Sequence, residues 1–233
     1  MCARGNGIYC VDIVMCIDAT GSMSSIIDEV KSNALSLYSK FVDEMELQNK
    51  FVEALRVKII AFRDFICDSN PMVESKFFEL PEQAAELRTF LDGVEAIGGG
   101  DGPECALEAI SVALNSNWTT EGYKRRHIIV VFSDAPTMTI GERAGCPNYP
   151  SDMPSDMKEL SSRWEGTDQL YYGSYNFEAG RLLGFVPDDP SWRRLQSWNR
   201  TTLTYTAAKG CSDIEMDEII NTVVGSIKAT TDE

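Results

Sequence analysis

The sequence has little of what zinc sites and disulfide frameworks require. His127 is the single histidine, and no Cys-x-x-Cys pair occurs among the seven cysteines. A zinc site is therefore not expected, and the odd number of cysteines favours free thiols in a reducing compartment. We expect Cys16, inside an apolar run, and Cys105, on a helix face, to be small buried hydrophobic residues.

Long apolar runs are also missing. None approaches the roughly 18 residues of a transmembrane helix, so no membrane span is expected. The first seven residues lead into an apolar run that already contains Asp12 and Asp18, which matches a secretory signal poorly. Together with the unpaired cysteines, this favours a cytoplasmic location.

Basic residues are scarce, with 21 against 36 acidic residues and a formal net charge of −15. Such a surface repels phosphate backbones, so nucleic acid is not an expected partner. It suits cations and basic protein surfaces, although the charge could serve solubility alone. The length of 233 residues and the 43% hydrophobic content are compatible with a single soluble domain over 1–233.

Apolar runs alternate with segments of helical periodicity along the chain. This alternation predicts an α/β fold: a doubly wound, mainly parallel six-stranded sheet with helices on both faces. Strands are predicted at 8–17, 55–62, 73–80, 127–132, 181–186 and 202–206. Helices are predicted at 24–47, 81–94, 103–114, 155–164, 191–198 and 214–227. Ser24 or Ser25 is expected to cap the first helix, and Ser212 or Asp213 the last.

Oxygen-bearing side chains follow these strands. Right-handed crossovers bring the loops after parallel strands to one rim, where ligands bind at the point of strand-order reversal. Asp18, Thr20 and Ser22 follow the first strand, Asp101 follows three glycines, and Asp134 follows the strand 127–132. Taken singly, the first three could be helix caps and Asp101 a turn residue or N-cap.

Hard divalent cations prefer oxygen ligands, and Mg²⁺ keeps several waters beside one or two carboxylates. The loops therefore predict a divalent cation bound by Asp18, Thr20, Ser22, Asp101 and Asp134. We expect Mg²⁺, with Mn²⁺ or Ca²⁺ as alternatives. A cation would also relieve the repulsion among these aspartates.

These motifs resemble the metal-ion-dependent adhesion site of von Willebrand factor A (vWA) domains, whose pattern is Asp-x-Ser-x-Ser, then Thr, then Asp. Asp18, Thr20 and Ser22 match the first element, with Thr in place of the first Ser, and Asp134 matches the final Asp. Asp101 stands at or near the Thr position, so whether it would bind directly or through water stays open. The glycine-rich segment is similar to that of hemicentin-like and alpha-kinase-linked A domains. The resemblance covers roughly 8–228 and is weakest in a predicted insertion at 141–180.

The resemblance implies a Rossmann-like fold and a protein-interaction module rather than an enzyme. In such modules the cation keeps a coordination position that an Asp or Glu of a protein partner can take. Intracellular bacterial members are often encoded beside kinases and phosphatases, so a kinase or phosphatase of the same system is a candidate partner.

Two alternatives stay open. One is a Mg²⁺-dependent phosphatase or phosphotransferase with Asp18 as nucleophile, although Thr20 stands where such families have a second aspartate. The other is a vWA scaffold with a degenerate metal site.

Outside the site, we expect Arg63 to pair with a local acid and Asp64 to be a supporting or surface group. We expect the four tryptophans to pack in the core or at its rim: Trp118, Trp164, Trp192 and Trp198.

Overall fold

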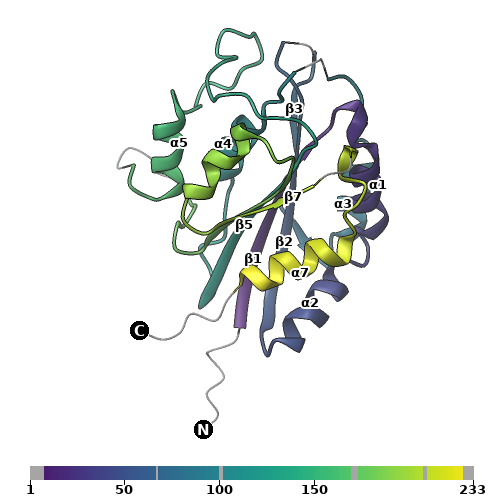
Figure 1. Ribbon diagram of the computed structural model, residues 1–233. Coiled ribbons are helices and arrows are strands. Elements are labelled where there is room, and N and C mark those ends of the chain that lie inside the picture. The colour runs from purple at the N-terminus through teal and green to yellow at the C-terminus, as the bar shows by residue number, and fades with distance from the viewer. Residues whose placement is uncertain (1–7, 67, 100–101, 169–172, 207–208, 228–233) are drawn as a thin grey trace.

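The fold is built on one twisted, mainly parallel sheet (Figure 1). The computed structural model describes residues 8–66, 68–99, 102–168, 173–206 and 209–227. Within them the sheet has seven strands in the order β3-β2-β1-β5-β6-β7, with β4 also paired to β2. The parallel strands are β1 (Ile8–Asp18), β2 (Phe51–Phe62), β5 (Lys124–Phe132), β6 (Gly180–Val186) and β7 (Thr201–Tyr205).

The predicted strand at 73–80 is instead two short strands, β3 (Met72–Glu74) and β4 (Phe78–Leu80), both antiparallel to β2. Ser75 separates them. Its hydroxyl accepts a hydrogen bond from the backbone N–H of Ile59 at 2.9 Å and donates to the carbonyl of Lys76. The Ser75 side chain thus takes the place of a backbone acceptor and interrupts the hydrogen-bond ladder with β2. Because β3 and β4 are separate, the sheet has seven strands rather than the predicted six.

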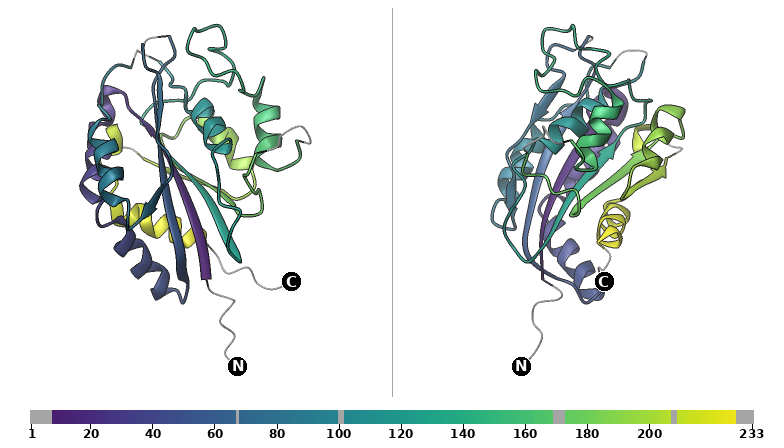
Figure 2. Two further views of the ribbon diagram at one scale, coloured as in Figure 1. Left: turned by 180° about the vertical axis from the view of Figure 1, so that it is seen from behind. Right: turned by 90° about the vertical axis from the view of Figure 1, so that its left-hand side faces the viewer.

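Helices cover both faces of the sheet, as predicted (Figures 1 and 2). Along β1, Ile13 and Met15 face one core while Val14 and Cys16 face the other, as the alternation of side chains on a strand requires. The first core lies under α1 (Ser24–Asn33), α2 (Leu37–Leu47), α3 (Ala84–Asp92) and α7 (Met216–Ser226). The second lies under α4 (Ala106–Leu114), α5 (Met157–Trp164), α6 (Pro190–Arg193) and the 3₁₀ turn η2 (Arg194–Ser197).

The predicted helix 24–47 is divided into α1 and α2. At the break, both the backbone N–H and the hydroxyl of Ser36 bond to the carbonyl of Asn33. The break forms because a local side-chain bond competes with the helical pattern.

The predicted N-caps are wrong. The N-cap of α1 is Met23, which makes no side-chain cap bond, and α7 is preceded by Glu215 rather than capped by Ser212 or Asp213. Glu29 of α1 accepts the hydrogen bond of the Met216 N–H at 2.8 Å. A neighbouring helix therefore supplies the cap, which local sequence could not reveal.

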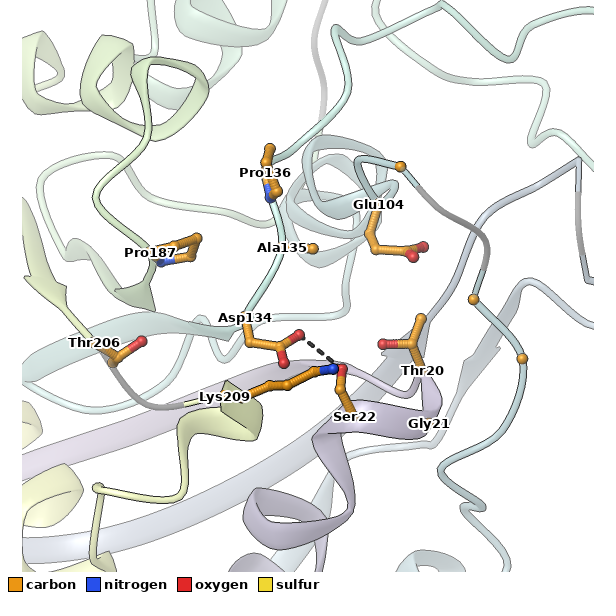
Figure 3. A pocket seen from close by; sticks show the side chains of 13 residues that line it. Thr20, Gly21, Ser22, Glu104, Asp134, Ala135, Pro136, Pro187, Thr206 and Lys209 are labelled. Atoms are coloured by element: carbon orange, nitrogen blue, oxygen red, sulfur yellow. Dashed lines mark hydrogen bonds between the residues drawn. The ribbon is translucent and has the colours of Figure 1, made fainter.

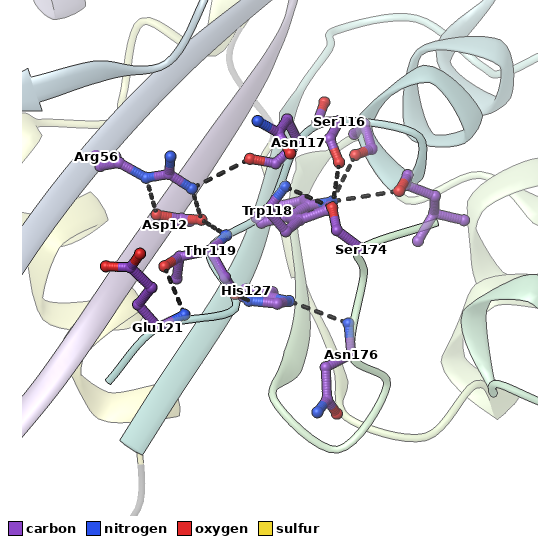
Figure 4. Close-up of polar contacts among 12 residues, drawn as sticks. Asp12, Arg56, Ser116, Asn117, Trp118, Thr119, Glu121, His127, Ser174 and Asn176 are labelled. Atoms are coloured by element: carbon purple, nitrogen blue, oxygen red, sulfur yellow. Dashed lines mark hydrogen bonds and ion pairs between the residues drawn. The ribbon is translucent and has the colours of Figure 1, made fainter. Parts of the chain in front are cut away.

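A polar cluster anchors the connection between α4 and β5 to the sheet (Figure 4). Asp12 of β1 is 1% exposed and accepts two hydrogen bonds from Arg56, at 2.8 and 2.6 Å, and one from the N–H of Thr119 at 2.6 Å. The ring of His127 stacks on that of Trp118, with centroids 4.9 Å apart.

The two cysteines expected in the core, Cys16 and Cys105, are buried, as are all four tryptophans.

None of the helices in the described part of the chain has the length and apolarity needed to cross a membrane.

Candidate functional site

Asp18 ends β1 as a fully buried carboxylate. One of its oxygens accepts hydrogen bonds from the hydroxyl and the backbone N–H of Thr20, at 2.7 and 3.0 Å. The other accepts a bond from the hydroxyl of Ser133 at 2.8 Å. Burial raises the pKa of Asp18, while these donors oppose the shift. Asp18 therefore ties the loop after β1 to the end of the adjacent strand β5.

Asp134 lies just beyond β5 and makes the second link between loops. Its Oδ1 accepts a hydrogen bond from the hydroxyl of Ser22 at 2.9 Å. Its Oδ2 accepts one from the backbone N–H of Gly210 at 2.8 Å, in the 3₁₀ turn η3 (Lys209–Cys211) before α7. Gly210 has a φ of 67° and packs against the backbone of Ser22, an approach that suits a residue without a Cβ.

The loops after β1 and β5 border a cavity of about 570 Å³ at the carboxyl ends of these strands (Figure 3), and Asp18 lies beneath it rather than in its lining. Strand β1 lies between β2 and β5, so the strand order reverses here. A ligand cavity at this position is the general expectation for open α/β sheets. Thr20, Ser22 and Asp134 all line it.

The glycine-rich loop forms another wall of the cavity. Gly98 and Gly99 have φ values of 74° and 83°. A Cβ at Gly99 would lie 2.8 Å from side-chain atoms of Thr20, and one at Gly98 would clash with the carboxylate of Asp68. Glycine is therefore required by both conformation and space. Asp101 lies outside the described residues, so its predicted role stays a prediction.

Glu104 also lines the cavity, although no sequence motif indicates it (Figure 3). Its side chain is buried, and its Oε2 has no hydrogen-bond partner among the described residues. Burial raises the pKa of Glu104 to about 8, and the nearby charges of Asp18, Asp64, Asp68 and Asp134 add to the shift. Its position just before α4 resembles an ordinary helix start, so the only available signal was its closeness to the triple glycine.

Lys209 is a second cavity residue that the sequence did not indicate. It belongs to η3, and its exposed side chain points toward Ser22 and Asp134 (Figure 3). The cavity therefore has a cationic side chain beside its acidic and hydroxyl groups. No sequence signal could have placed it there, because the position depends on how the turn before α7 packs.

The prediction that Arg63 pairs with an acid is wrong. Its Nε donates to the carbonyls of Ala19 and Ile97, both at 3.0 Å, and its Nη2 to the carbonyl of Glu95 at 2.6 Å. Arg63 thus fastens the loop after β1 to the segment that precedes the glycines. Asp64 instead pairs with Arg143 at 3.0 Å, at the start of the predicted insertion.

The cavity offers oxygen donors. Within the parts of the chain that the structure describes, no group of three or more histidine, cysteine, aspartate or glutamate side chains is placed to hold a metal ion. The donors are the hydroxyls of Thr20 and Ser22 and the carboxylates of Asp134 and Glu104. Such a set fits a hard cation that keeps several waters, and it does not fit zinc.

Comparisons with curated proteins give two relatives. The chain is 24% identical over 180 residues to the alpha-protein kinase vwkA of Dictyostelium discoideum. The matched region covers 76% of this chain and 27% of that protein. It is 30% identical over 127 residues to a putative ariadne-like RING finger protein, R811, of Acanthamoeba polyphaga mimivirus. This matched region covers 54% of this chain and 11% of that protein. The chain thus spans only a minor part of the relatives it matches.

Solved structures share the fold. The pilus adhesin SpaC of Lactobacillus rhamnosus GG matches with a TM-score of 0.55 and 12% identity, over 94% of this chain and 30% of that one. A von Willebrand factor type A structure from Catenulispora acidiphila matches with a TM-score of 0.53 and 10% identity, over 95% of this chain and 43% of that one. The family model of the von Willebrand factor A domain matches residues 12–141, more than half of the sequence. The chain belongs to the von Willebrand factor A domain family.

Proposed function

We propose that this domain is a metal-dependent protein-interaction module that binds a partner's acidic side chain through a divalent cation, Mg²⁺ in the cell. The observation that carries the proposal is the 2.9 Å hydrogen bond between Ser22 and Asp134. It brings a hydroxyl from the loop after β1 and a carboxylate from the loop after β5 to one cavity at the strand-order reversal. The direct ligands that we propose are Thr20, Ser22 and Asp134, with Asp18 behind them holding Thr20 in place. Asp101 is added on the sequence pattern alone.

Some of these residues would bind the cation, and others orient the residues that bind it. Ser22 and Asp134 offer oxygens at the cavity wall, while Asp18 orients Thr20 through two hydrogen bonds. When bound, a divalent cation with few protein carboxylates retains exchangeable water that a carboxylate from outside can replace. The partner is therefore a protein that presents an exposed Asp or Glu.

The burial of Asp18 favours this function over phosphoryl transfer. A nucleophile must reach the atom it attacks, whereas Asp18 is 0% exposed and both of its oxygens accept hydrogen bonds. Asp18 is thus placed to organise the loops. Thr20 fills the position in which a second aspartate would act as acid or base.

We infer the class of partner from the net charge of the domain and from its relatives. We propose a cytoplasmic protein, with a kinase or phosphatase system as the setting, since one relative is named an alpha-protein kinase. The formal net charge of −15 disfavours nucleic acid. An intracellular bacterial origin, as the sequence pattern predicts, stays a prediction.

Chelation tests the proposal. Proteins captured on the immobilised domain in Mg²⁺ are expected to be released by EDTA and recovered when Mg²⁺ or Mn²⁺ is restored. Asp134→Asn should abolish capture, whereas Asp43→Asn, on the exposed surface of α2, removes the same charge and should not. A partner that stays bound equally well in EDTA would overturn the proposal.

A further inference from the structure

We infer that Lys209 is a second contact for the partner's acidic side chain, so that one carboxylate is held both by the cation and by the Lys209 ammonium. The inference rests on the proposed function and names the residue of this chain that receives the partner beside the ion. Lys209 lies in η3 and lines the cavity together with Ser22 and Asp134. Its amino group points toward both of them (Figure 3).

The charge balance of the cavity calls for a further positive group. Asp18 lies beneath the cavity and Asp134 lines it, and their two negative charges together balance a divalent cation. Glu104 adds another carboxyl group at the wall. The loaded cavity would therefore carry no net positive charge without Lys209, and the formal net charge of −15 repels an approaching carboxylate. Lys209 supplies a positive charge at the cavity itself.

The turn that carries Lys209 is fixed relative to two of the proposed ligands. The N–H of the next residue, Gly210, donates to Oδ2 of Asp134 at 2.8 Å. The same glycine packs so closely on Ser22 that a Cβ would clash with the Ser22 carbonyl oxygen. The base of the Lys209 side chain thus has a defined place beside Ser22 and Asp134. Its flexible four-carbon stem lets the ammonium adjust to a ligand.

A structural ion pair does not account for Lys209. Three other lysines pair with carboxylates of this chain: Lys40, Lys58 and Lys76. Lys209 forms no such pair with the residues that the structure describes, and its side chain is exposed. The ammonium is therefore available to an acidic group that comes from outside.

The two sides of the cavity differ in charge, which would orient that group. Glu104 stands on one side and Lys209 with Thr206 on the other, and Ser22 and Asp134 lie between them (Figure 3). A carboxylate is repelled on the Glu104 side and attracted on the Lys209 side. Because it has two oxygens that accept independently, it can contact the cation through one and the ammonium through the other.

The test uses the domain saturated with Mn²⁺ and two small probes. Acetyl-aspartate methylamide represents the partner's acidic side chain, and acetyl-asparagine methylamide is its neutral match. Broadening of the probe's proton NMR signals by Mn²⁺ shows that the probe lies beside the ion, and titration gives its dissociation constant. Lys209→Met removes the charge, Lys209→Arg keeps it, and Lys158→Met removes an exposed charge on α5. Thermal unfolding checks that each variant is folded.

We expect the aspartate probe to bind the wild type and the asparagine probe not to bind. Lys209→Met should bind the aspartate probe about twofold to fivefold more weakly, as for an exposed ion pair, whereas Lys209→Arg and Lys158→Met should match the wild type. Added NaCl should weaken binding to the wild type more than to Lys209→Met, because salt screens the ammonium contact.

Equal affinities of Lys209→Met and the wild type for the aspartate probe would overturn this inference and leave the proposed function standing. Lys209 would then serve only to offset the charge of the aspartates. Equal weakening in Lys209→Met and Lys158→Met would overturn it too, because the effect would then follow from net charge alone. No Mn²⁺-dependent binding of the aspartate probe by the wild type would overturn both the inference and the proposed function.

Discussion

Ser22 and Asp134 are separated by 112 positions in the sequence, yet the Ser22 hydroxyl lies 2.9 Å from Oδ1 of Asp134. The contact joins the loop after β1 to the loop after β5, the two neighbouring strands between which the strand order reverses. Asp18 makes a parallel link to Ser133 at 2.8 Å. Two independent hydrogen bonds thus hold the hydroxyl and carboxylate groups of the cavity in one arrangement.

Replacing Ser22 by alanine is expected to weaken Mg²⁺ binding by about tenfold or more. The variant loses one proposed oxygen ligand and also the hydrogen bond that orients Asp134. Calorimetry with Mg²⁺ measures the change. Ser24→Ala removes an exposed hydroxyl only two positions away and should bind as the wild type does. Equal affinities for the two variants would argue against a ligand role for Ser22.

Replacing Lys209 by methionine is expected to tighten binding of a divalent cation several-fold. The ammonium group points toward Ser22 and Asp134, so it repels a cation in the cavity. Lys158→Met, on the exposed side of α5, makes the same change in net charge away from the site. The Mn²⁺ dissociation constants of both variants decide the matter, and an unchanged constant in Lys209→Met would refute the expectation.

The residues that end buried strands could be placed from the sequence. Parallel strands end at one rim, so the loops after β1 and β5 are expected to meet. The hydrogen bonds of Ser133 with Asp18 and of Ser22 with Asp134 join these two loops. The sheet and its two helical layers could also be predicted, because a buried parallel strand and an amphipathic helix have different patterns of apolar residues in the sequence.

Contacts that depend on how loops pack could not be placed. Glu104 looked like a residue at a helix start, and the position of Lys209 depends on the turn at Gly210. The sequence predicts an acidic partner for Arg63 because charged residues can be read from it, whereas the backbone carbonyls that Arg63 binds cannot. Ser75 and Ser36 likewise end a strand and a helix through hydrogen bonds that composition does not reveal.

Removing Arg56 is expected to destabilise the fold by about 3 kcal/mol or more. The side chain of Asp12 is 1% exposed, and Arg56→Met would leave its buried charge without a counter-ion. Arg88→Met breaks an exposed pair with Asp92, whose side chains are 40% and 53% exposed, and should cost less than about 1 kcal/mol. Urea denaturation at pH 7 gives both values, and similar losses in the two variants would contradict this account.

His127 is expected to make stability depend on pH in the acidic range. Its Nδ1 accepts a hydrogen bond from the N–H of Asn176 at 3.1 Å, so the neutral ring carries its proton on Nε2, which faces the carbonyl of Thr119 at 3.0 Å. Burial lowers the pKa of His127 from 6.5 to about 4. The unfolded chain therefore takes up a proton first as the pH falls. The stability due to the neutral ring is complete above the ordinary pKa and is lost as the pH approaches the lowered one.

His127→Gln keeps a donor and an acceptor without a group that titrates. The wild type should lose about 2–3 kcal/mol more than this variant between pH 7 and pH 4.5. Carboxylates titrate alike in both proteins, so the difference isolates His127. Parallel losses of unfolding free energy, measured in urea at the two pH values, would show that the ring does not titrate as described.

The most direct test of the central claim is a crystal of the domain grown with Mn²⁺ and measured for anomalous scattering. We expect one strong peak in the cavity, at bonding distance from the Ser22 hydroxyl and an oxygen of Asp134. A cavity without a peak at millimolar Mn²⁺, or a peak bound elsewhere on the acidic surface, would contradict the account.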